Sequence, residues 1–310
     1  MAKKSKPQIW LEYTAARGLL GFLGFLPKKA AVSAAISVAM TGYYLLGGLR
    51  RVAMTNLRIA FPELSESEHE RLAKGAFKSL GRVLGEMSHF RSATRESLEK
   101  TIEFQIDPEV YAEYQRLKAT GRGVIIVSPH LGNWELLVYG WSALREPISY
   151  LARPLDNPKI EALTVRLRTK FGNRPINKTN SVTLAMKILR EGGILGILAD
   201  VNAHPKEGVF VPFFGVPACT SSGVALLAMR TNAAIIPMCG AWDDEKQNYV
   251  GAHGRIVYPS TTGDRHRDVA ETTAQFTAEV EKLIRRFPDQ WLWIHKRWKT
   301  RPPGEPEIYK

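Results

Sequence analysis

The segment Gly123-Val-Ile-Ile-Val-Ser-Pro-His-Leu-Gly-Asn-Trp-Glu135 decides how the rest of the sequence is interpreted. Its first six residues form a short apolar run rich in β-branched side chains, which is typical of a strand buried on both faces. A helical pattern follows from about residue 133 to residue 144. A buried strand, a tight turn and a helix in this order indicate an α/β fold.

The same alternation continues on both sides of this segment. Strands are expected near residues 148–152, 193–199, 234–239 and 247–257, and helices near 65–90, 108 onward, 157–171, 182–190, 221–230 and 267–286. We therefore predict an α/β fold with a mixed central sheet flanked by helices. We expect two parts, a helical, membrane-associating N-terminal segment (residues 1–60) and the domain that carries the chemistry (residues 61–310).

The composition restricts the partners. The chain has 310 residues and a formal net charge of +13, which favours anionic lipid, phosphorylated substrates, an acidic protein or nucleic acid. No helix-turn-helix or zinc-finger pattern accompanies the charge, so nucleic acid is not expected. Cys219 and Cys239 lack metal-ligand spacing, and we expect neither a metal site nor a disulfide, in keeping with a reducing cytoplasmic setting.

The N-terminal part is mostly apolar from residue 11 to residue 49. Its uncharged run 30–49 is long enough in principle to cross a bilayer, but it is rich in Ala, Gly and Ser, which insert weakly. We expect it to lie in the membrane interface or to cross once; two Ala-rich helices packed on the domain are the alternative. Arg50, Arg51 and Arg58 follow and suit an anionic cytoplasmic membrane surface.

The turn after the first quoted strand carries residues suited to general-base chemistry. His130 lies in the turn, Glu135 lies in the first helical turn, and Gly132 permits the tight backbone path between them. A histidine is a base near neutral pH, and a carboxylate against its other ring nitrogen would fix the tautomer. The alternative is a structural histidine in a loop, with Glu135 merely favourable at a helix N-terminus.

At this point the sequence resembles a known family. His130-Leu-Gly-Asn-Trp-Glu135 is similar to the HxxxxE motif of the lipid A biosynthesis lauroyl/myristoyl acyltransferases, within the wider glycerolipid-type acyltransferase superfamily. Four further stretches match the family in order along nearly the whole chain: Asn56-Leu-Arg-Ile-Ala-Phe-Pro-Glu63; Arg153-Pro154 with Asn157; Val209-Phe-Val-Pro-Phe-Phe-Gly215 with Ala218 and Thr220; and Pro288-Asp-Gln-Trp-Leu-Trp-Ile-His295 with Lys299-Thr-Arg-Pro302.

The resemblance implies a reaction and its participants. A fatty acyl thioester, on acyl carrier protein or coenzyme A, would donate its chain to a hydroxyl of a phosphorylated glycolipid, a lipid A precursor, at the cytoplasmic face of a bacterial inner membrane. No cofactor beyond this co-substrate is implied. His130 would be the general base and Glu135 its orienter. Arg153 would contact a phosphate or the developing oxyanion, and Asn133 either donates a hydrogen bond in the pocket or caps the helix.

One departure from the family pattern leaves the acceptor open. The family often carries Asp-Gln-Asp after the strand near residues 193–199, whereas this chain has Asp200-Val-Asn202. Asp200 is retained, with a role in acceptor contact or in a turn. Another bacterial glycolipid or an aminolipid therefore remains an alternative acceptor, and a lipid or thioester hydrolase with the same dyad remains an alternative activity.

Two more stretches have two interpretations each. The apolar run 209–214 could line an acyl groove or form a buried strand. The basic residues Lys296, Arg297, Lys299 and Arg301 could meet acceptor phosphates or a carrier protein, or could form a solvated end.

Overall fold

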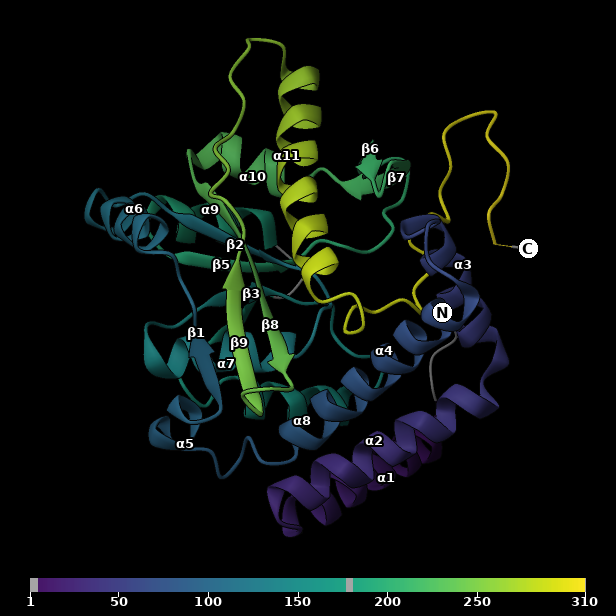
Figure 1. The fold of residues 1–310 in the computed structure, drawn as a ribbon. Coiled ribbons are helices and arrows are strands. Elements are labelled where there is room, and N and C mark those ends of the chain that lie inside the picture. The colour runs from purple at the N-terminus through teal and green to yellow at the C-terminus, as the bar shows by residue number, and fades with distance from the viewer. Residues whose placement is uncertain (1–4, 177–180, 310) are drawn as a thin grey trace.

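The computed structural model describes residues 5–176 and 181–309. Within these residues the chain forms eleven helices and nine strands (Figure 1). The helices are α1 (Lys6–Phe25), α2 (Lys28–Leu45), α3 (Gly47–Ala60), α4 (Glu66–Met87), α5 (Arg95–Glu99), α6 (Pro108–Ala119), α7 (Trp134–Leu144), α8 (Pro158–Arg168), α9 (Ser181–Arg190), α10 (Gly223–Thr231) and α11 (Arg265–Arg286). The strands are β1 (Ile102–Phe104), β2 (Val124–Ser128), β3 (Ser149–Leu151), β4 (Arg174–Ile176), β5 (Ile194–Leu198), β6 (Gly208–Phe213), β7 (Val216–Ser221), β8 (Ala234–Asp243) and β9 (Asn248–His253).

The central sheet is mixed, as expected. Its seven strands run in the order β1-β9-β8-β2-β5-β3-β4. Neighbouring strands are parallel except β8 and β9, which form an antiparallel pair. The strand that the sequence singled out, β2, lies at the centre of the sheet, and all five of its residues are buried. The short strands β1 and β4 and the strand β7 were not predicted, whereas β6 corresponds to the run 209–214, for which a strand was one of two interpretations.

Helices cover both faces of the sheet. Ile125 and Val127 of β2 point into the larger apolar cluster, to which α9, α10 and α11 contribute. Val124 and Ile126 point to the opposite face, where α6 and α7 pack. Adjacent residues of a strand face opposite sides, so the continuous apolar run of β2 is explained by burial on both faces. Figure 1 shows α11 running across the first of these faces.

The N-terminal apolar run does not form one straight helix. α2 ends at Leu45, α3 begins at Gly47, and their axes differ by 88°. No single helix in the described residues has both the length and the apolar character of a membrane span, although the bent pair of α2 and α3 passes the same criteria when the two are combined. Membrane attachment of this segment therefore stays a prediction.

α2 packs closely on α4 because two glycines of α4 permit it. A Cβ atom at Gly81 would lie 2.5 Å from the Cα of Ile36, and one at Gly85 would lie 2.6 Å from the Cα of Val32. Part of the N-terminal segment is therefore joined to the rest of the chain as tightly as helices in a protein core.

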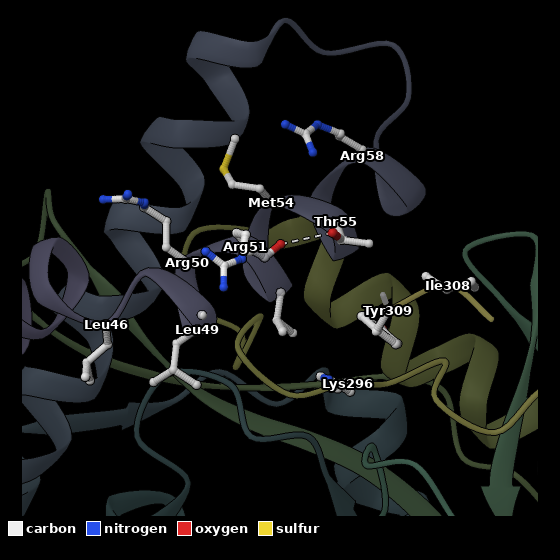
Figure 2. Close-up of a pocket in the computed structure, with 12 residues that line it drawn as sticks. Leu46, Leu49, Arg50, Arg51, Met54, Thr55, Arg58, Lys296, Ile308 and Tyr309 are labelled. Atoms are coloured by element: carbon white, nitrogen blue, oxygen red, sulfur yellow. Dashed lines mark hydrogen bonds between the residues drawn. The ribbon is translucent and has the colours of Figure 1, made fainter.

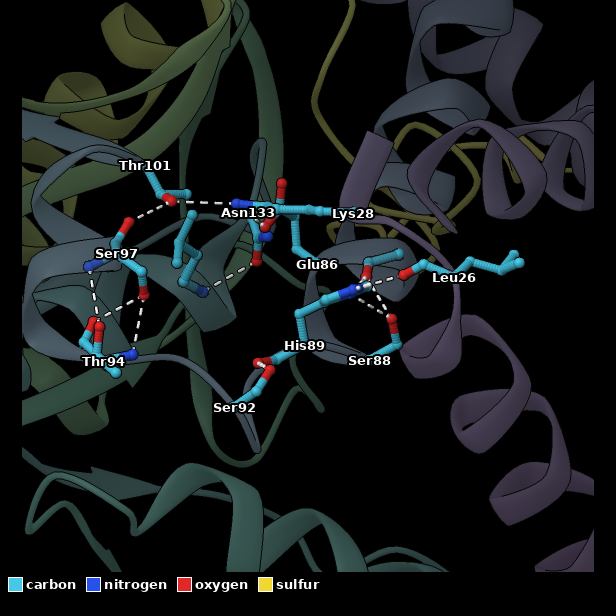
Figure 3. A network of polar contacts seen from close by, with 12 residues as sticks. Leu26, Lys28, Glu86, Ser88, His89, Ser92, Thr94, Ser97, Thr101 and Asn133 are labelled. Carbon is cyan, nitrogen blue, oxygen red and sulfur yellow. Dashed lines mark hydrogen bonds and ion pairs between the residues drawn. The ribbon is translucent and has the colours of Figure 1, made fainter. Parts of the chain in front are cut away.

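A polar network ties the start of α2 to the same helix. Figure 3 shows Lys28 between Glu86 and Thr101, with Nζ 3.0 Å from Oε2 of Glu86 and 3.1 Å from Oγ1 of Thr101. The ring of His89 donates from Nε2 to the carbonyl oxygen of Leu26 at 3.1 Å. Burial raises the pKa of Glu86, although the Lys28 ammonium opposes this shift. These contacts fix where the helical N-terminal segment meets the sheet domain.

Two of the family-like stretches meet each other in the core. Asn56 of α3 is fully buried, and its Nδ2 donates to the carbonyl oxygens of Trp293 and His295 at 2.6 and 2.7 Å. Its Oδ1 accepts from the hydroxyl of Tyr309. The side chain of Asn56 thus holds the C-terminal stretch against α3 by hydrogen bonds. The role of this motif residue is structural.

Candidate active site

The turn between β2 and α7 is held by backbone hydrogen bonds. Gly132 has φ +59°, and a Cβ atom there would lie 2.2 Å from the carbonyl oxygen of Gly240, so only glycine fits. Its N–H donates to the carbonyl oxygen of Gln290 at 3.0 Å, and the N–H of Asn133 donates to that of Gly240 at 2.7 Å. The expectation of a tight turn at Gly132 is confirmed, and the turn places the neighbouring His130 rigidly.

His130 faces Asp200, and the sheet register explains why. β2 and β5 are parallel, and Ser128 pairs with Leu198. His130 stands two residues after the end of β2, and Asp200 stands two residues after the end of β5. The carboxyl ends of these neighbouring strands therefore bring the two side chains together. Nδ1 of His130 lies 2.7 Å from Oδ1 of Asp200, and the backbone N–H of His130 donates to Oδ2 at 2.7 Å.

Asp200 is built to stay ionised. Its side chain is only 2% exposed, and the indole Nε1 of Trp291 donates to Oδ2 at 2.7 Å. Burial acts to raise its pKa, but the charge of His130 and the hydrogen bonds from His130 and Trp291 outweigh burial and lower the pKa to about 2. A buried carboxylate with several donors is stabilised in its charged form.

The imidazole responds in the opposite direction. Burial acts to lower the pKa of His130, but the charge and hydrogen bond of Asp200, together with the charge of Glu135, raise it overall. Because Nδ1 is engaged by a carboxylate, it carries the proton in the neutral ring, and Nε2 is left as the basic nitrogen. The ring is 20% exposed and packs edge-on against Trp134, with 5.1 Å between ring centroids.

The expected contact between His130 and Glu135 is wrong. Glu135 forms a bidentate ion pair with Arg168, in which Nε of the guanidinium lies 2.7 Å from Oε2 and the second nitrogen meets Oε1. Glu135 lies in the first turn of α7, and its side chain extends toward the end of α8. The pairing of β2 with β5 instead places Asp200 next to Nδ1 of His130. The structure therefore assigns the orienting position to Asp200, and a catalytic role of Glu135 stays a prediction.

These groups share one cavity of about 480 Å³. His130, Glu135 and Arg168 line it beside Arg153, whose side chain is 59% exposed and whose guanidinium lies 3.2 Å from Asp156. The remaining wall is mostly apolar and is formed by Ile126, Trp134, Val138, Leu151, Leu155, Ile197 and Leu198. An apolar pocket with a few convergent polar groups at the carboxyl ends of parallel strands is a typical ligand site of an α/β fold.

Tyr150 is a further polar group of the cavity wall. Its hydroxyl is buried and forms no hydrogen bond with any residue that the structure describes, and burial raises its pKa to about 12. The ring lies beside Arg168, with the guanidinium carbon 5.8 Å from the ring centroid. Tyr150 therefore offers a neutral hydroxyl within the apolar part of the cavity.

Asn133 caps α7 rather than lining the cavity. Its Oδ1 accepts from the N–H of Leu136 at 2.9 Å, and the residue is fully buried. It is absent from the residues that line the His130 cavity. The geometry favours the capping alternative for this residue.

The departure at Asn202 also lies outside the cavity. Its amide donates to Oγ1 of Thr300 at 3.0 Å and accepts from the N–H of the same residue at 2.9 Å, so it clasps the C-terminal stretch. Within the segment 200–202, Asp200 forms hydrogen bonds with both the ring and the backbone N–H of His130, and it does not itself line the cavity.

The run 209–214 is a half-buried strand and its end, in which Val211, Phe213 and Phe214 are buried while Phe210 and Pro212 are exposed. It forms β6 and its end, and Phe213 packs against Trp291 and Trp298 while Phe214 packs against Phe61 and Trp293. None of its residues lines the His130 cavity. The run is therefore a strand buried on one face only, and it does not contribute to the His130 cavity.

The basic C-terminal residues do not act as one group. Arg297 is fully buried, donates to the carbonyl oxygen of Cys219 at 2.8 Å and lies over the ring of Phe213. Burial lowers its pKa to about 10. Arg301 donates to the carbonyl oxygen of Pro217 at 2.7 Å, whereas Lys296 and Lys299 are exposed. Arg297 is thus a core residue, contrary to both interpretations of this stretch.

Two site residues were missed from the sequence. Arg168 and Trp291 lie far from His130 in sequence, and nothing local marks either as a partner of a carboxylate. The signal for Asp200 was available: it stands two residues past an apolar strand, as His130 does. In the described residues no group of three or more His, Cys, Asp or Glu side chains is arranged to hold a metal.

Comparisons with known proteins agree with one another. Residues 2–300 match the family model described as bacterial lipid A biosynthesis acyltransferase. The chain is 28% identical over 308 residues to the lipid A biosynthesis lauroyltransferase of Escherichia coli (strain K12), covering 98% of this chain and 96% of that protein. It is 28% identical to the palmitoleoyltransferase of the same organism over 98% of this chain and 95% of that protein, and 24% identical to its myristoyltransferase over 84% and 78%.

Proposed function

The chain belongs to the bacterial lipid A biosynthesis acyltransferase family, and on this premise we propose that it transfers a fatty acyl chain from an acyl thioester to a hydroxyl of a lipid A precursor. The observation that carries the proposal is His130, held by the ionised Asp200 at the wall of an apolar cavity. The donor is a thioester of acyl carrier protein or coenzyme A, and no resident cofactor is required.

The reaction needs a base and no protein nucleophile. Nε2 of His130 takes the proton of the acceptor hydroxyl while that oxygen attacks the thioester carbonyl carbon, which gives a tetrahedral intermediate. The intermediate collapses, the carbon–sulfur bond breaks, and the departing thiolate takes the proton from Nε2. Asp200 holds the tautomer that leaves Nε2 basic and stabilises the imidazolium in between.

Arg168 and Arg153 supply positive charge around this centre. Glu135 fixes the guanidinium of Arg168 in the cavity wall, so that its charge is in place before a substrate enters. Preorganised charge of this kind stabilises a developing oxyanion or holds a phosphate of the acceptor. Arg153 is more exposed and lies toward solvent, where it suits a phosphate of the glycolipid.

The apolar surface of α1 and α2 suits attachment to the cytoplasmic face of the inner membrane. Large apolar side chains are exposed along both helices, and these are Trp10, Leu11, Leu19, Phe22, Phe25, Val38, Tyr44 and Leu45. Contiguous exposed apolar surface on a protein marks a membrane or protein contact. We propose that these helices lie on the membrane that holds the lipid acceptor.

The experiment compares acyl transfer with acyl release. Purified enzyme is incubated with a lipid A precursor and either acyl carrier protein or coenzyme A thioesters, and mass spectrometry reads acylated lipid and free fatty acid separately. We expect acylated lipid to dominate with the wild type and to fall at least about a thousandfold in His130→Ala. His266→Ala, an exposed histidine of α11, is the matched control and should retain full activity.

Two outcomes would contradict the proposal. Free fatty acid as the main product would indicate a hydrolase, and an active, folded His130→Ala enzyme would refute the base. In cells, lipid A of a strain that lacks the gene should lose one acyl chain, and the gene for His130→Ala should not restore it.

A further inference from the structure

A second cavity lies between α3 and the C-terminal residues. It has a volume of about 730 Å³ and shares no residue with the His130 cavity. Figure 2 shows Leu46 and Leu49 at one side of this view, Tyr309 and Ile308 at the other, and Arg51 between them with Lys296 below. We refer to it as the α3 cavity.

The α3 cavity carries positive charge that the fold does not neutralise. Arg51 and Lys296 are exposed, and neither forms an ion pair with any described residue. Arg50 lies over the ring of Tyr43, and Arg58 is paired with Glu66. Among residues 5–176 and 181–309, no acidic side chain lines the cavity. Two unpaired cations that face a hollow in this way are suited to hold a phosphate group.

Apolar side chains line one side of the α3 cavity. At the 88° corner between α2 and α3, Leu45 is 76% exposed and Leu46 is 53% exposed, and Leu49 follows one turn along α3. This corner continues the apolar surface of α2 through Tyr44. Two cations beside an apolar corner are complementary to a phospholipid, whose anionic headgroup is joined to apolar acyl chains. An acidic protein surface would offer the negative charge without the acyl chains.

We propose that the α3 cavity binds the phosphate group of an anionic phospholipid of the membrane, with Arg51 and Lys296 on the phosphate and Leu46 and Leu49 against the acyl chains. The proposal deepens the membrane attachment described above and rests on it, but it does not depend on the reaction. Occupation of the cavity would fix how the enzyme lies on the membrane, because α3 and the C-terminal stretch are clasped together through Asn56.

The test measures binding to vesicles of phosphatidylcholine, with and without equimolar phosphatidylglycerol. The wild type should prefer the anionic vesicles. Arg51→Gln/Lys296→Gln should weaken binding to anionic vesicles by roughly twenty-fivefold, about fivefold for each cation, and should leave binding to neutral vesicles unchanged. Arg190→Gln/Arg265→Gln removes the same charge from exposed sites outside the cavity and should change binding less than about twofold.

A second variant fills the cavity without changing charge. Gly48 lines the α3 cavity and is exposed, and a Cβ atom there would meet no atom within 4 Å, so a side chain can begin at this position without a clash. Gly48→Phe should lose most of the preference for anionic vesicles, whereas Gly48→Ala should keep it.

The outcomes separate the proposal from its rivals. Equal losses in the two double variants would indicate diffuse surface charge, and full anionic preference in Gly48→Phe would place the lipid elsewhere; each result overturns the site. A loss of binding to acyl carrier protein, with vesicle binding intact, would overturn it in favour of a protein partner. His130→Ala should bind anionic vesicles like the wild type, so failure of the reaction and failure of the lipid site are distinguishable.

Discussion

The His130 cavity and the α3 cavity differ in how their charges are satisfied. In the first, each buried charge has a built partner, because His130 meets Asp200 and Glu135 meets Arg168. In the second, Arg51 and Lys296 stay exposed and form no ion pair with any described residue, and the ammonium of Lys296 lies 5.8 Å from the centre of the Tyr309 ring. Buried charges must be paired to be tolerated, so the first cavity has a fixed field before any ligand arrives. Exposed cations stay hydrated, and their attraction to an anionic ligand is screened by salt.

This difference predicts different consequences of mutation. Changes in the His130 cavity should lower the rate of the chemical step, whereas changes in the α3 cavity should alter membrane binding and its dependence on salt.

Among the residues that surround His130, removing the charge of Asp200 should have the largest effect. Asp200→Asn should lower kcat/KM by roughly a thousandfold, because the amide no longer stabilises the imidazolium and permits the wrong tautomer. Steady-state kinetics with a purified lipid acceptor measure the loss. Asp244→Asn, at an exposed position, is the control and should behave like the wild type. An Asp200→Asn enzyme within about tenfold of the wild type would remove Asp200 from the mechanism.

Breaking the ion pair between Glu135 and Arg168 should lower kcat/KM less than the change at Asp200. Glu135→Gln should lower kcat/KM by about a hundredfold, since it leaves Arg168 in the cavity wall without its counter-ion. Arg168→Gln should cost a similar amount, and the double variant should lose little more than either single variant. A double-mutant cycle measures this coupling. Fully additive losses would show that Glu135 acts independently of Arg168, as an orienter of His130 would.

The pH dependence should report the raised pKa of His130. The base acts as neutral imidazole, so kcat/KM should fall about tenfold for each pH unit below that pKa, with the midpoint above the ordinary value of about 6.5. Because the charge of Glu135 helps to raise this pKa, Glu135→Gln should move the acid limb to lower pH. A limb that moves upward, or stays in place, would contradict the electrostatic contribution of Glu135.

Loss of one donor to Asp200 should have a smaller effect. Trp291→Phe keeps an aromatic ring in the core and removes the indole N–H that donates to Oδ2. We expect kcat/KM to fall roughly tenfold, the scale of one hydrogen bond to a charged group. Thermal unfolding should accompany the kinetics, so that a loss caused by misfolding is recognised. An unchanged rate would show that the other donors suffice to hold Asp200.

The smallest effect on turnover should come from the α3 cavity. Arg51→Gln/Lys296→Gln should change kcat in detergent micelles by less than about twofold, because neither residue lines the His130 cavity. Assays in neutral micelles measure this directly. A large fall in kcat under these conditions would mean that the two cavities act as one site.

Much of the fold could be predicted from local pattern. The apolar β-branched run of β2, the capping box of Ser65 and Glu68 at α4, and the Pro108 start of α6 all appear where local chemistry places them. The unpredicted strands β1 and β4 have three residues each, too few to show a period, and they exist because neighbouring strands pair with them.

The candidate site divides in the same way. The sequence by itself determined that His130 stands in a tight turn after a buried strand, since Gly132 and the surrounding pattern are local features. Only the tertiary structure decided which carboxylate binds the imidazole of His130. The parallel register of β2 and β5 places Asp200 against Nδ1, and the position of α8 places Arg168 against Glu135. Sequence spacing describes distance along one chain segment, and hydrogen bonds between strands and helices depend on how separate segments pack.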